Sequence, residues 1–361
     1  MSRFVPMTVT AIDRTSRDAV VLSLAASDLS PNWSFRAGQY LTFRQTFDGE
    51  EIRRSYSICA PESAAQLRVG VKRVDGGAFS TFANERLAVG DTLEAMPPEG
   101  RFGDLPAGVG GTHMLGVAAG SGITPVLSIL STHLEAAFEH RFTLIYGNRS
   151  SSSIMFREEL EDLKNRYLGR LNLVHVLSRE RQEIELFNGR LDASKCASLF
   201  ESWVDLRSVA AAFVCGPEAM MQVVREALLA RGLAAAQIRL EMFAPDGAAS
   251  RARATERQRR EAQPATRERT AEVHIDGRVL EFPVAAGTET LLDAGLRAGV
   301  ELPYSCKGGV CSTCMARVVE GEVEMDANFA LEDYELARGY VLCCQSYPLS
   351  ERVVVEYAHA L

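Results

Sequence analysis

Five of the eight cysteines in this chain of 361 residues lie between positions 306 and 344. Cys306, Cys311 and Cys314 follow the spacing C-x4-C-x2-C in one short segment, and Cys343 and Cys344 form an adjacent pair downstream. Thiolates bind iron and zinc, and the remaining cysteines are scattered along the chain. A local group of this kind indicates a metal site rather than a set of disulfides.

The spacing in the first three cysteines is that of plant-type ferredoxins, which hold a 2Fe-2S cluster with four cysteine thiolates. Gly308, Gly309, Ser312 and Thr313 are small, so backbone N–H groups of the segment can approach the cluster sulfurs. A four-thiolate zinc site is the alternative, but such sites usually consist of two C-x2-C pairs. The predicted ligands are Cys306, Cys311, Cys314 and Cys344.

The fourth ligand is chosen by resemblance, because five cysteines compete for four positions. The segment 339–346 resembles the ferredoxin strand in which the last cysteine follows an apolar run by one small residue. The resemblance implies that Cys344 is the ligand and that Cys343 packs in the core.

A second group of residues, Arg53 to Ser57, fits the motif R-x-Y-S, which marks flavin sites in the ferredoxin-NADP reductase superfamily. The resemblance implies that Arg54 pairs with a flavin phosphate, that Tyr56 packs on the ring system, and that Ser57 reaches the flavin N5 edge. An ordinary exposed strand face is the alternative. A second segment of that superfamily, which binds the pyrophosphate, is matched by Val71, Lys72, Gly76, Gly77 and Ser80.

Two glycine-containing turns predict a nicotinamide nucleotide site. Gly120, Gly122 and Thr124 follow an apolar strand and open a helix, although the full G-x-G-x-x-G pattern is absent. Glycines let phosphate oxygens approach backbone amides, and the threonine adds a hydroxyl. A plain strand-to-helix turn is the alternative. About 95 residues later the pattern recurs as the C-G-P motif of the same superfamily, formed by Cys215, Gly216 and Pro217.

In that motif the resemblance implies that Cys215 helps to orient the nicotinamide, with packing in a buried strand as the alternative. Arg149 follows the second predicted sheet strand, where an arginine suits a ribose 2'-phosphate, so NADPH is favoured. Glu241 and Phe243, at the end of this region, are further candidate catalytic residues. The resemblance implies that Phe243 covers the flavin until nicotinamide displaces it, and a core aromatic is the alternative.

The elements that must position these residues change in character along the chain. Residues 1–103 read as short alternating strands separated by glycine turns, which predicts an antiparallel β-barrel that binds flavin. In residues 104–246, apolar strands at 114–119, 142–147, 171–177 and 213–215 alternate with helical stretches at 124–138, 155–167 and 217–231. This alternation predicts a doubly wound parallel α/β sheet for the nicotinamide nucleotide.

The rest of the chain divides into a linker and a third domain. Residues 247–270 contain seven arginines among small polar residues and interleaved acids, which predicts a solvated linker. Residues 271–361 begin with an alternating strand, predicted over 271–284, and are expected to form the α+β (β-grasp) ferredoxin domain. The predicted protein is therefore multidomain.

Composition excludes some partners and locations. The net charge of −8 supplies no positive field for nucleic acid. No secretory pattern begins the sequence, and the uncharged stretch at 114–132 is interrupted by Gly120, Gly122 and Pro125. We therefore expect a cytoplasmic protein that spans no membrane.

Taken in this order, the three motif groups resemble reductases that join a flavin barrel, a nicotinamide domain and a C-terminal ferredoxin. Within that superfamily the chain is most similar to the phenylacetyl-CoA epoxidase reductase family. The segments that carry this similarity are 49–54, 144–149, 302–311 and 339–342. The doubled cysteine at 343 and 344 departs from the commoner single cysteine.

The resemblance implies FAD, NADPH and a 2Fe-2S cluster as cofactors, with a low cluster potential of about −400 mV. Hydride from NADPH is expected to reach FAD, and single electrons are expected to pass through the cluster to a di-iron oxygenase. The alternative is a reductase of a ring-hydroxylating dioxygenase or an oxidative demethylase that uses NADH and FMN. An electron carrier without reductase activity and a zinc protein are the other classes. The stretch 318–337 holds seven acidic residues and no Lys or Arg, which predicts a docking face for the oxygenase, with an ordinary solvated acidic face as the alternative.

Overall fold

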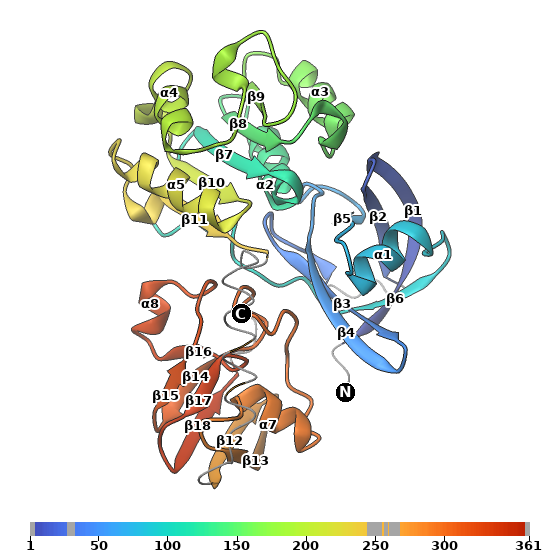
Figure 1. Ribbon diagram of the computed structural model, residues 1–361, viewed down its shortest axis with the longest axis vertical. Helices are drawn as coiled ribbons and strands as arrows, with labels where there is room; N and C mark the ends of the chain where they lie inside the picture. The colour runs from blue at the N-terminus through green and yellow to red at the C-terminus, as the bar shows by residue number, and fades with distance from the viewer. Residues whose placement is uncertain (1–3, 27–32, 244–254, 256–258, 260–267, 358–361) are drawn as a thin grey trace. The chain divides into compact units, whose positions relative to one another are not determined.

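The computed structural model describes residues 4–26, 33–243, 255, 259 and 268–357 (Figure 1). The chain forms two compact units, Met1–Glu241 and Met242–Leu361. The first unit contains an antiparallel barrel and a parallel α/β sheet. The second contains a mixed sheet with short helices.

The barrel at the start of the first unit is a six-stranded antiparallel sheet in the order β4-β3-β6-β1-β2-β5. Its elements are β1 (Val5–Ser16), β2 (Ala19–Ala26), β3 (Tyr40–Phe47), β4 (Glu50–Ser57), β5 (Leu67–Lys72), α1 (Ala78–Glu85) and β6 (Thr92–Ala95). The sheet closes just past the end of β4, where Ile58 bridges Val69 of β5. Alternate residues of these strands, such as Leu22, Phe43 and Val71, fill the interior.

Turn chemistry sets the register of the strands that carry the R-x-Y-S motif. β3 and β4 pair from Phe47 and Glu50 back to Tyr40 and Ser57. The two residues between them, Asp48 and Gly49, both have positive φ values of 51° and 86°. An Asp-Gly pair with both residues at positive φ is the favoured two-residue hairpin turn.

The second part of this unit is a five-stranded parallel sheet in the order β11-β10-β7-β8-β9. Its strands are β7 (His113–Ala119), β8 (Arg141–Asn148), β9 (Leu171–Leu177), β10 (Ala211–Cys215) and β11 (Ile238–Glu241). Its helices are α2 (Ile123–Ala136), α3 (Arg157–Arg166), α4 (Ala193–Ser202) and α5 (Glu218–Leu229), of which α4 and α5 lie together (Figure 1). Short 3-10 turns occupy Gly120–Gly122, Ser151–Ser153, Glu185–Phe187, Leu206–Ser208 and Ala235–Gln237.

The chain leaves β7 toward β8 on one side and later reaches β10 on the other side. The carboxyl ends of β7 and β10 therefore form the switch point at which doubly wound sheets bind ligands.

The second unit has a five-stranded sheet in the order β13-β12-β18-β14-β16, with β12 and β18 parallel and the other pairs antiparallel. Its elements are β12 (Glu268–Ile275), β13 (Arg278–Ala285), α7 (Leu291–Arg297), β14 (Met315–Glu320), β15 (Val323–Met325), α8 (Asp333–Leu336), β16 (Tyr340–Leu342), β17 (Ser346–Pro348) and β18 (Arg352–Glu356). β15 and β17 form a separate pair, and the core joins buried residues of α7 to those of the large sheet.

The predicted fold class is confirmed, but three details of the prediction were wrong or incomplete. The strand predicted over 271–284 is a hairpin of β12 and β13, turned by Asp276 and Gly277 with φ values of 51° and 73°. β12 begins at Glu268, three residues before the predicted start of this domain. Helix α4 was not predicted. Residues 247–267 of the predicted linker, other than Thr255 and Arg259, lie outside the described residues.

Candidate functional site

The two arginines of the R-x-Y-S segment lie next to each other on strand β4 but have different surroundings. Arg53 is buried, pairs with Glu51 at 2.8 Å, and lies 4.9 Å from the centroid of the Phe4 ring. Arg54 is exposed, and its Nη1 donates to the carbonyl of Arg53 at 2.7 Å. Arg54 shares a strand face with Tyr56, because side chains two positions apart project to the same side. Arg54 is thus the arginine that a ligand can reach, and Arg53 supports the strand.

The Tyr56 ring is held by aromatic neighbours inside the barrel. Its centroid lies 5.4 Å from that of Phe79 and 6.2 Å from that of Phe43. Burial raises the pKa of the Tyr56 hydroxyl, and the nearby Arg54 charge opposes this shift. The ring therefore stays neutral and keeps a fixed orientation, as a packing surface for a planar cofactor requires.

The second flavin segment, from β5 into α1, uses its side chains mostly within the protein. Val71 is fully buried, and Lys72 Nζ lies 3.6 Å from Asp18. The Ser80 hydroxyl donates to the carbonyl of Gly77 at 3.2 Å and accepts from the Val74 N–H at 3.1 Å. This segment can therefore offer a ligand mainly its backbone at the start of α1. Gly76, at a φ of 74°, turns the chain just before that helix.

Glycines at the switch point allow two loops to touch. A Cβ atom on Gly122 would lie 2.2 Å from the backbone oxygen of Cys215, and one on Gly216 would lie 3.1 Å from the Cβ of Ala119. Gly120 has a φ of 55°. Gly122 and Gly216 therefore allow the loops after β7 and β10 to pack closely against each other at the switch point.

The neighbouring polar and proline residues of these loops shape the turns. Thr124 is buried, and its hydroxyl donates to the carbonyl of Ser121 at 3.0 Å. The Thr124 hydroxyl therefore stabilises the 3-10 turn before α2. Pro217 is the N-cap residue of α5.

Three of the four predicted catalytic residues come together in the first unit. Ser57 Oγ donates to Glu241 Oε2 at 3.3 Å, across 184 positions of sequence, and Cys215 pairs in register with Glu241 between β10 and β11. Burial raises the pKa of Glu241 to about 8, although the Ser57 hydrogen bond opposes this. Burial and the Glu241 charge raise the pKa of the Cys215 thiol. Burial therefore favours the protonated, neutral forms of both the carboxyl and the thiol.

Phe243, the fourth predicted catalytic residue, follows β11 by two positions and is 41% exposed. The side chain that was predicted to cover the flavin is therefore accessible and is not a core aromatic.

Arg149 is exposed directly after β8, and its carbonyl accepts from the Arg179 N–H at 2.8 Å. The serine turn that follows, Ser151–Ser153, binds the side chain of Glu180, a residue that the sequence prediction did not include. Glu180 Oε2 accepts from the N–H and from the hydroxyl of Ser151, at 2.8 and 2.9 Å. These hydrogen bonds lower the pKa of Glu180. An exposed cation and an acceptor bound to the serine turn therefore both lie near the end of β8.

The predicted cluster ligands form two thiol pairs in the second unit. Cys306 and Cys311 lie with their sulfurs 3.1 Å apart, and the Cys314 and Cys344 thiols are also hydrogen-bonded. Cys344 further interacts electrostatically with Cys306, which joins the pairs. Two pairs suit a two-iron cluster, because each iron then takes two of the four thiolates. Among the described residues, no three His, Cys, Asp or Glu side chains form a group that could hold a single metal ion.

The Cys343 thiol interacts electrostatically with Cys314 and Cys344, but its side-chain hydrogen bond is with Tyr357. Burial raises the pKa of its thiol to about 12, and the Tyr357 hydroxyl is the neighbour that opposes this shift. Cys343 packs in the core, where it is 1% exposed. Cys344 is equally buried, so it is its hydrogen bond with the Cys314 thiol that supports Cys344 as the fourth ligand.

Hydrogen-bond donors surround the thiols, as the small residues of the segment predict. The Gly308 N–H donates to Cys306 Sγ at 3.3 Å, and the Gly309 N–H donates to Cys344. Hydrogen bonds from the Cys311 thiol and from backbone N–H groups lower the pKa of Cys306. Hydrogen bonds with the Cys314 thiol, Gln345 and the Gly309 N–H lower the pKa of Cys344. Within each pair one thiol has a lowered pKa, and the thiol bound to it, Cys311 or Cys314, has a raised one.

Gln345 is a cluster neighbour that the sequence prediction missed. Its Nε2 lies 3.5 Å from Cys344 Sγ and donates to the carbonyl of Lys307 at 3.0 Å. The side chain joins the two segments that carry the ligands. A glutamine directly after a ligand cysteine is the available signal, but its orientation is not visible in a sequence.

The acidic residues of the stretch 318–337 differ from one another in exposure and in ion pairing. Glu320 pairs with Arg352 at 2.5 Å, and Glu335 is 3% exposed and accepts from the Glu332 N–H. Exposed carboxylates remain at Glu322 and Asp333, among others.

Three family models match successive parts of the chain. An oxidoreductase FAD-binding domain matches residues 6–103, an oxidoreductase NAD-binding domain matches 117–226, and a 2Fe-2S iron-sulfur cluster binding domain matches 273–349. The chain is 44% identical to a subunit of 1,2-phenylacetyl-CoA epoxidase from Escherichia coli (strain K12), over 99% of this chain and 98% of that protein. The chain belongs to the phenylacetyl-CoA epoxidase reductase family.

Other members of the wider group also match along their whole length. The ferredoxin reductase component of 3-ketosteroid-9-alpha-monooxygenase from Rhodococcus rhodochrous is 34% identical over 99% of this chain and 97% of its own. The crystal structure of phthalate dioxygenase reductase shares the fold, with a TM-score of 0.60, 22% identity, and 98% of each chain covered. This chain is an oxidoreductase with FAD-binding, NAD-binding and 2Fe-2S domains.

The predicted family and the predicted cofactor domains are thus confirmed. As a member of this reductase family, the chain belongs with electron-transfer components that serve oxygenases. Within the described part of the chain, no helix is both long and apolar enough to cross a membrane.

Proposed function

We propose that this protein transfers electrons from NADPH, through FAD and a 2Fe-2S cluster, to the di-iron oxygenase component of a phenylacetyl-CoA epoxidase. The observation that carries the proposal is the meeting of Ser57, Cys215 and Glu241 at the carboxyl ends of β10 and β11. A flavin-motif residue and a nicotinamide-motif residue thereby approach the same carboxyl group. The 44% identity to a phenylacetyl-CoA epoxidase subunit supports the choice of oxygenase.

Each part of the first unit has a proposed task. Exposed Arg54 and the backbone at Gly77 bind the flavin phosphates, and Tyr56 supports the ring system. Gly120, Gly122 and Gly216 let the nucleotide phosphates approach the backbone. FAD, when bound, accepts electrons as a pair and releases them singly.

The remaining residues orient the reacting groups. Ser57 Oγ holds the flavin N5 edge, and Cys215 positions the nicotinamide. Burial raises the pKa of Glu241 to about 8, so its carboxyl is neutral at pH 7. It accepts a hydrogen bond from the Ser57 hydroxyl and places no negative charge beside the path of hydride transfer. Phe243 covers the flavin until nicotinamide arrives. Arg149 favours the 2'-phosphate of NADPH, whereas Glu180 opposes it.

In the second unit, the proposed ligands are Cys306, Cys311, Cys314 and Cys344. They would hold a 2Fe-2S cluster that takes up one electron at a time. Such a cluster requires reduced thiols, and we place the protein in the cytoplasm, where thiols stay reduced.

The test is reconstitution of the purified holoprotein with the oxygenase subunits and phenylacetyl-CoA. We expect FAD on extraction, iron and sulfide in equal amounts, faster turnover with NADPH than with NADH, and NADPH consumption coupled to epoxide formation. FMN with a preference for NADH would instead favour a dioxygenase or demethylase reductase. Zinc without iron, or no reduction of cytochrome c by NADPH, would contradict electron transfer altogether.

We also propose that exposed carboxylates of the stretch 318–337 dock the oxygenase. Reversing the charges of Glu322, Glu324 and Asp333 should raise the KM for the oxygenase, most strongly at low ionic strength. Reduction of cytochrome c should stay unchanged, as a control for an intact internal path. An unchanged KM for the oxygenase across ionic strengths would contradict this face.

A further inference from the structure

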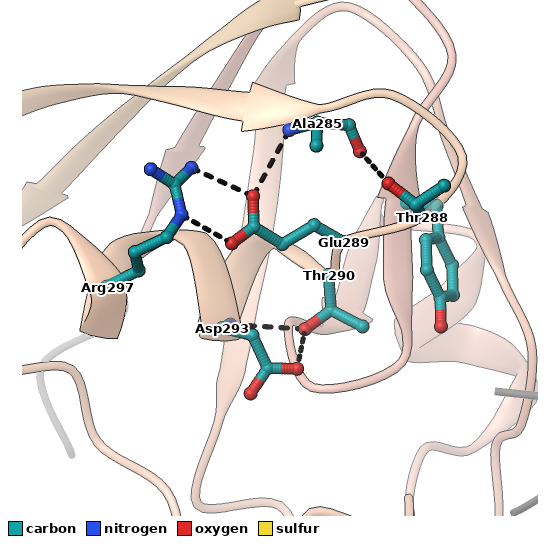
Figure 2. A pocket seen from close by; sticks show the side chains of 7 residues that line it. Ala285, Thr288, Glu289, Thr290, Asp293 and Arg297 are labelled. Carbon is teal, nitrogen blue, oxygen red and sulfur yellow. Dashed lines mark hydrogen bonds and ion pairs between the residues drawn. The ribbon is translucent and has the colours of Figure 1, made fainter. Parts of the chain in front are cut away.

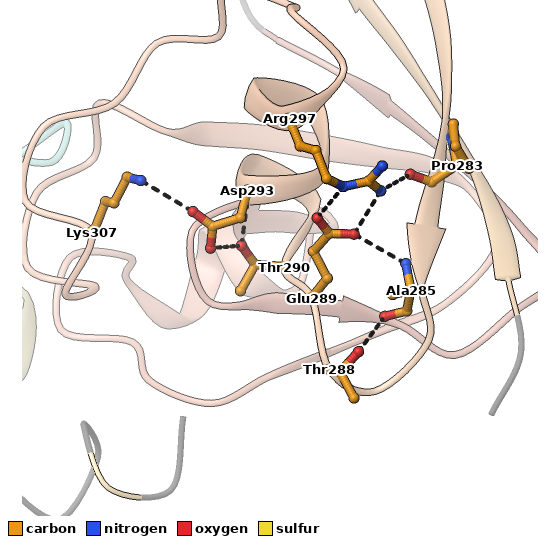
Figure 3. A network of polar contacts seen from close by, with 8 residues as sticks. All are labelled: Pro283, Ala285, Thr288, Glu289, Thr290, Asp293, Arg297 and Lys307. Carbon is orange, nitrogen blue, oxygen red and sulfur yellow. Dashed lines mark hydrogen bonds and ion pairs between the residues drawn. The ribbon is translucent and has the colours of Figure 1, made fainter. Parts of the chain in front are cut away.

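A lysine sits within the cysteine segment, directly after the first proposed ligand. Lys307 adopts a left-handed backbone conformation with a φ of 50°, and its carbonyl accepts from Gln345 at 3.0 Å. Its ammonium lies 3.1 Å from Asp293 Oδ1 (Figure 3) and 4.9 Å from the centroid of the Tyr304 ring. The position of the Lys307 side chain is therefore fixed by its backbone conformation and by the contacts of its ammonium group.

Asp293, on α7, is fixed in turn by the start of that helix. Its second carboxylate oxygen accepts from Thr290 Oγ1 at 2.7 Å, and its own N–H donates to the same hydroxyl at 3.1 Å (Figure 2). Thr290 is 2% exposed. The carboxylate cannot turn away from Lys307 without losing these bonds, so the charge pair is preorganised.

A second ion pair joins Arg297, at the end of α7, to Glu289, which lies just before the helix. Glu289 binds Arg297 through two contacts of 2.7 and 2.9 Å, and Arg297 also donates to the carbonyl of Pro283 in β13 (Figure 3). Glu289 and Arg297 thus tie α7 to the sheet, whereas Asp293 and Lys307 tie it to the cysteine segment. Asp293, Glu289 and Arg297 border a cavity of about 350 Å³, so shorter or neutral side chains there cause no crowding.

We propose that the Lys307–Asp293 pair sets the reduction potential of the cluster held by the neighbouring thiolates. Reduction adds one electron, and hence one negative charge, to the cluster. The Lys307 cation favours that added charge and the Asp293 anion opposes it. The potential with both residues present therefore lies between the values expected when either charge is removed. The inference rests on the proposed ligation by the four cysteines.

The expected size follows from one unit charge near the cluster with partial access to solvent. Lys307 is 37% exposed and Asp293 is 24% exposed. Removing either charge should change the ratio of reduced to oxidised cluster, at a fixed applied potential, on the order of threefold. With 59 mV per tenfold for one electron, this is a shift of about 28 mV.

The experiment measures midpoint potentials of the full-length holoprotein by redox titration, with the EPR signal of the reduced cluster as the readout. Lys307→Met should lower the potential and Asp293→Asn should raise it. The double variant should return close to the parent value. Both single shifts should shrink at high salt, because the charges are partly exposed. Arg297→Met is the matched control, since it removes an ion-paired cation from α7, the helix that carries Asp293, but not from the cysteine segment. It should lower stability and leave the potential unchanged.

Shifts of the same sign in both single variants, or unchanged potentials with intact EPR signals, would overturn the inference. Lys307→Gln serves if the methionine variant folds poorly, and Asp293→Asn tests the opposite sign independently. A parent protein without iron and sulfide would overturn the proposed ligation itself, which distinguishes the two failures.

Discussion

Replacing Glu241 by glutamine should change how the stability of the first unit depends on pH. Burial raises the pKa of Glu241 from 4.5 to about 8. The folded state therefore keeps a proton that the unfolded state releases, and stability falls as pH rises from the unfolded pKa to the folded one. One pKa unit equals about 1.36 kcal/mol, so from about pH 6 to pH 8 this residue should remove about 2.7 kcal/mol. Because the side chain is partly exposed, this value is an upper bound.

In the Glu241→Gln variant the side chain stays neutral at every pH and still accepts the Ser57 hydrogen bond. The variant should thus match the parent only below about pH 4.5, where Glu241 is protonated in both states, and its advantage in stability should grow until about pH 8. Urea unfolding of the full-length protein, followed by release of the flavin, measures the difference. Glu226→Gln, the same change on the exposed face of α5, is the control and should follow the parent curve. Parallel curves for the Glu241 variant and the parent would refute the assigned protonation.

Three further outcomes are expected. Gly122→Ala should destabilise the first unit by about 1 to 3 kcal/mol and slow flavin reduction by NADPH, because its Cβ would lie 2.2 Å from the Cys215 oxygen. Gln345→Leu should lower the cluster midpoint potential in redox titrations, since it removes an amide donor 3.5 Å from Cys344 Sγ. Burial lowers the pKa of His113, so thermal stability should fall as pH drops below about 6.5, and less so in His113→Gln.

Controls separate these outcomes from general damage. Gly110→Ala, where an added Cβ meets no atom within 4 Å, should leave stability unchanged. A Gly122→Ala protein as stable as this control would contradict the close approach at the switch point. An unchanged potential in Gln345→Leu would show that this amide does not act on the cluster. Equal acid sensitivity of the His113 variant and the parent would assign the effect to other groups.

Residues that act through local spacing were accessible to sequence reasoning. The C-x4-C-x2-C segment, the R-x-Y-S strand and the glycine turns each carry their geometry within a few positions. The apolar strands of the parallel sheet were found for the same reason, because a buried strand is recognisable by its own composition. The order of these segments was sufficient to predict the fold class.

Contacts between distant residues were not accessible in this way. The Ser57–Glu241 hydrogen bond spans 184 positions, and nothing local in either segment specifies it. Lys307 and Asp293 are both ordinary surface residue types by sequence, and only the fold places them 3.1 Å apart. The Asp276-Gly277 turn did carry a local hairpin signal, which the alternating pattern on both sides obscured.

The edge of the flavin barrel has a consequence for how the protein avoids self-association. Within the described residues, β4 pairs with β3 along its length and meets β5 just past its end, at Ile58 and Val69. An open strand edge is a template on which another chain can add a strand. Here that edge begins Glu-Glu-Ile-Arg-Arg, and neighbouring charges of both signs make a matching strand costly to align. The charged start of β4 therefore disfavours the addition of a strand from a second chain at this edge.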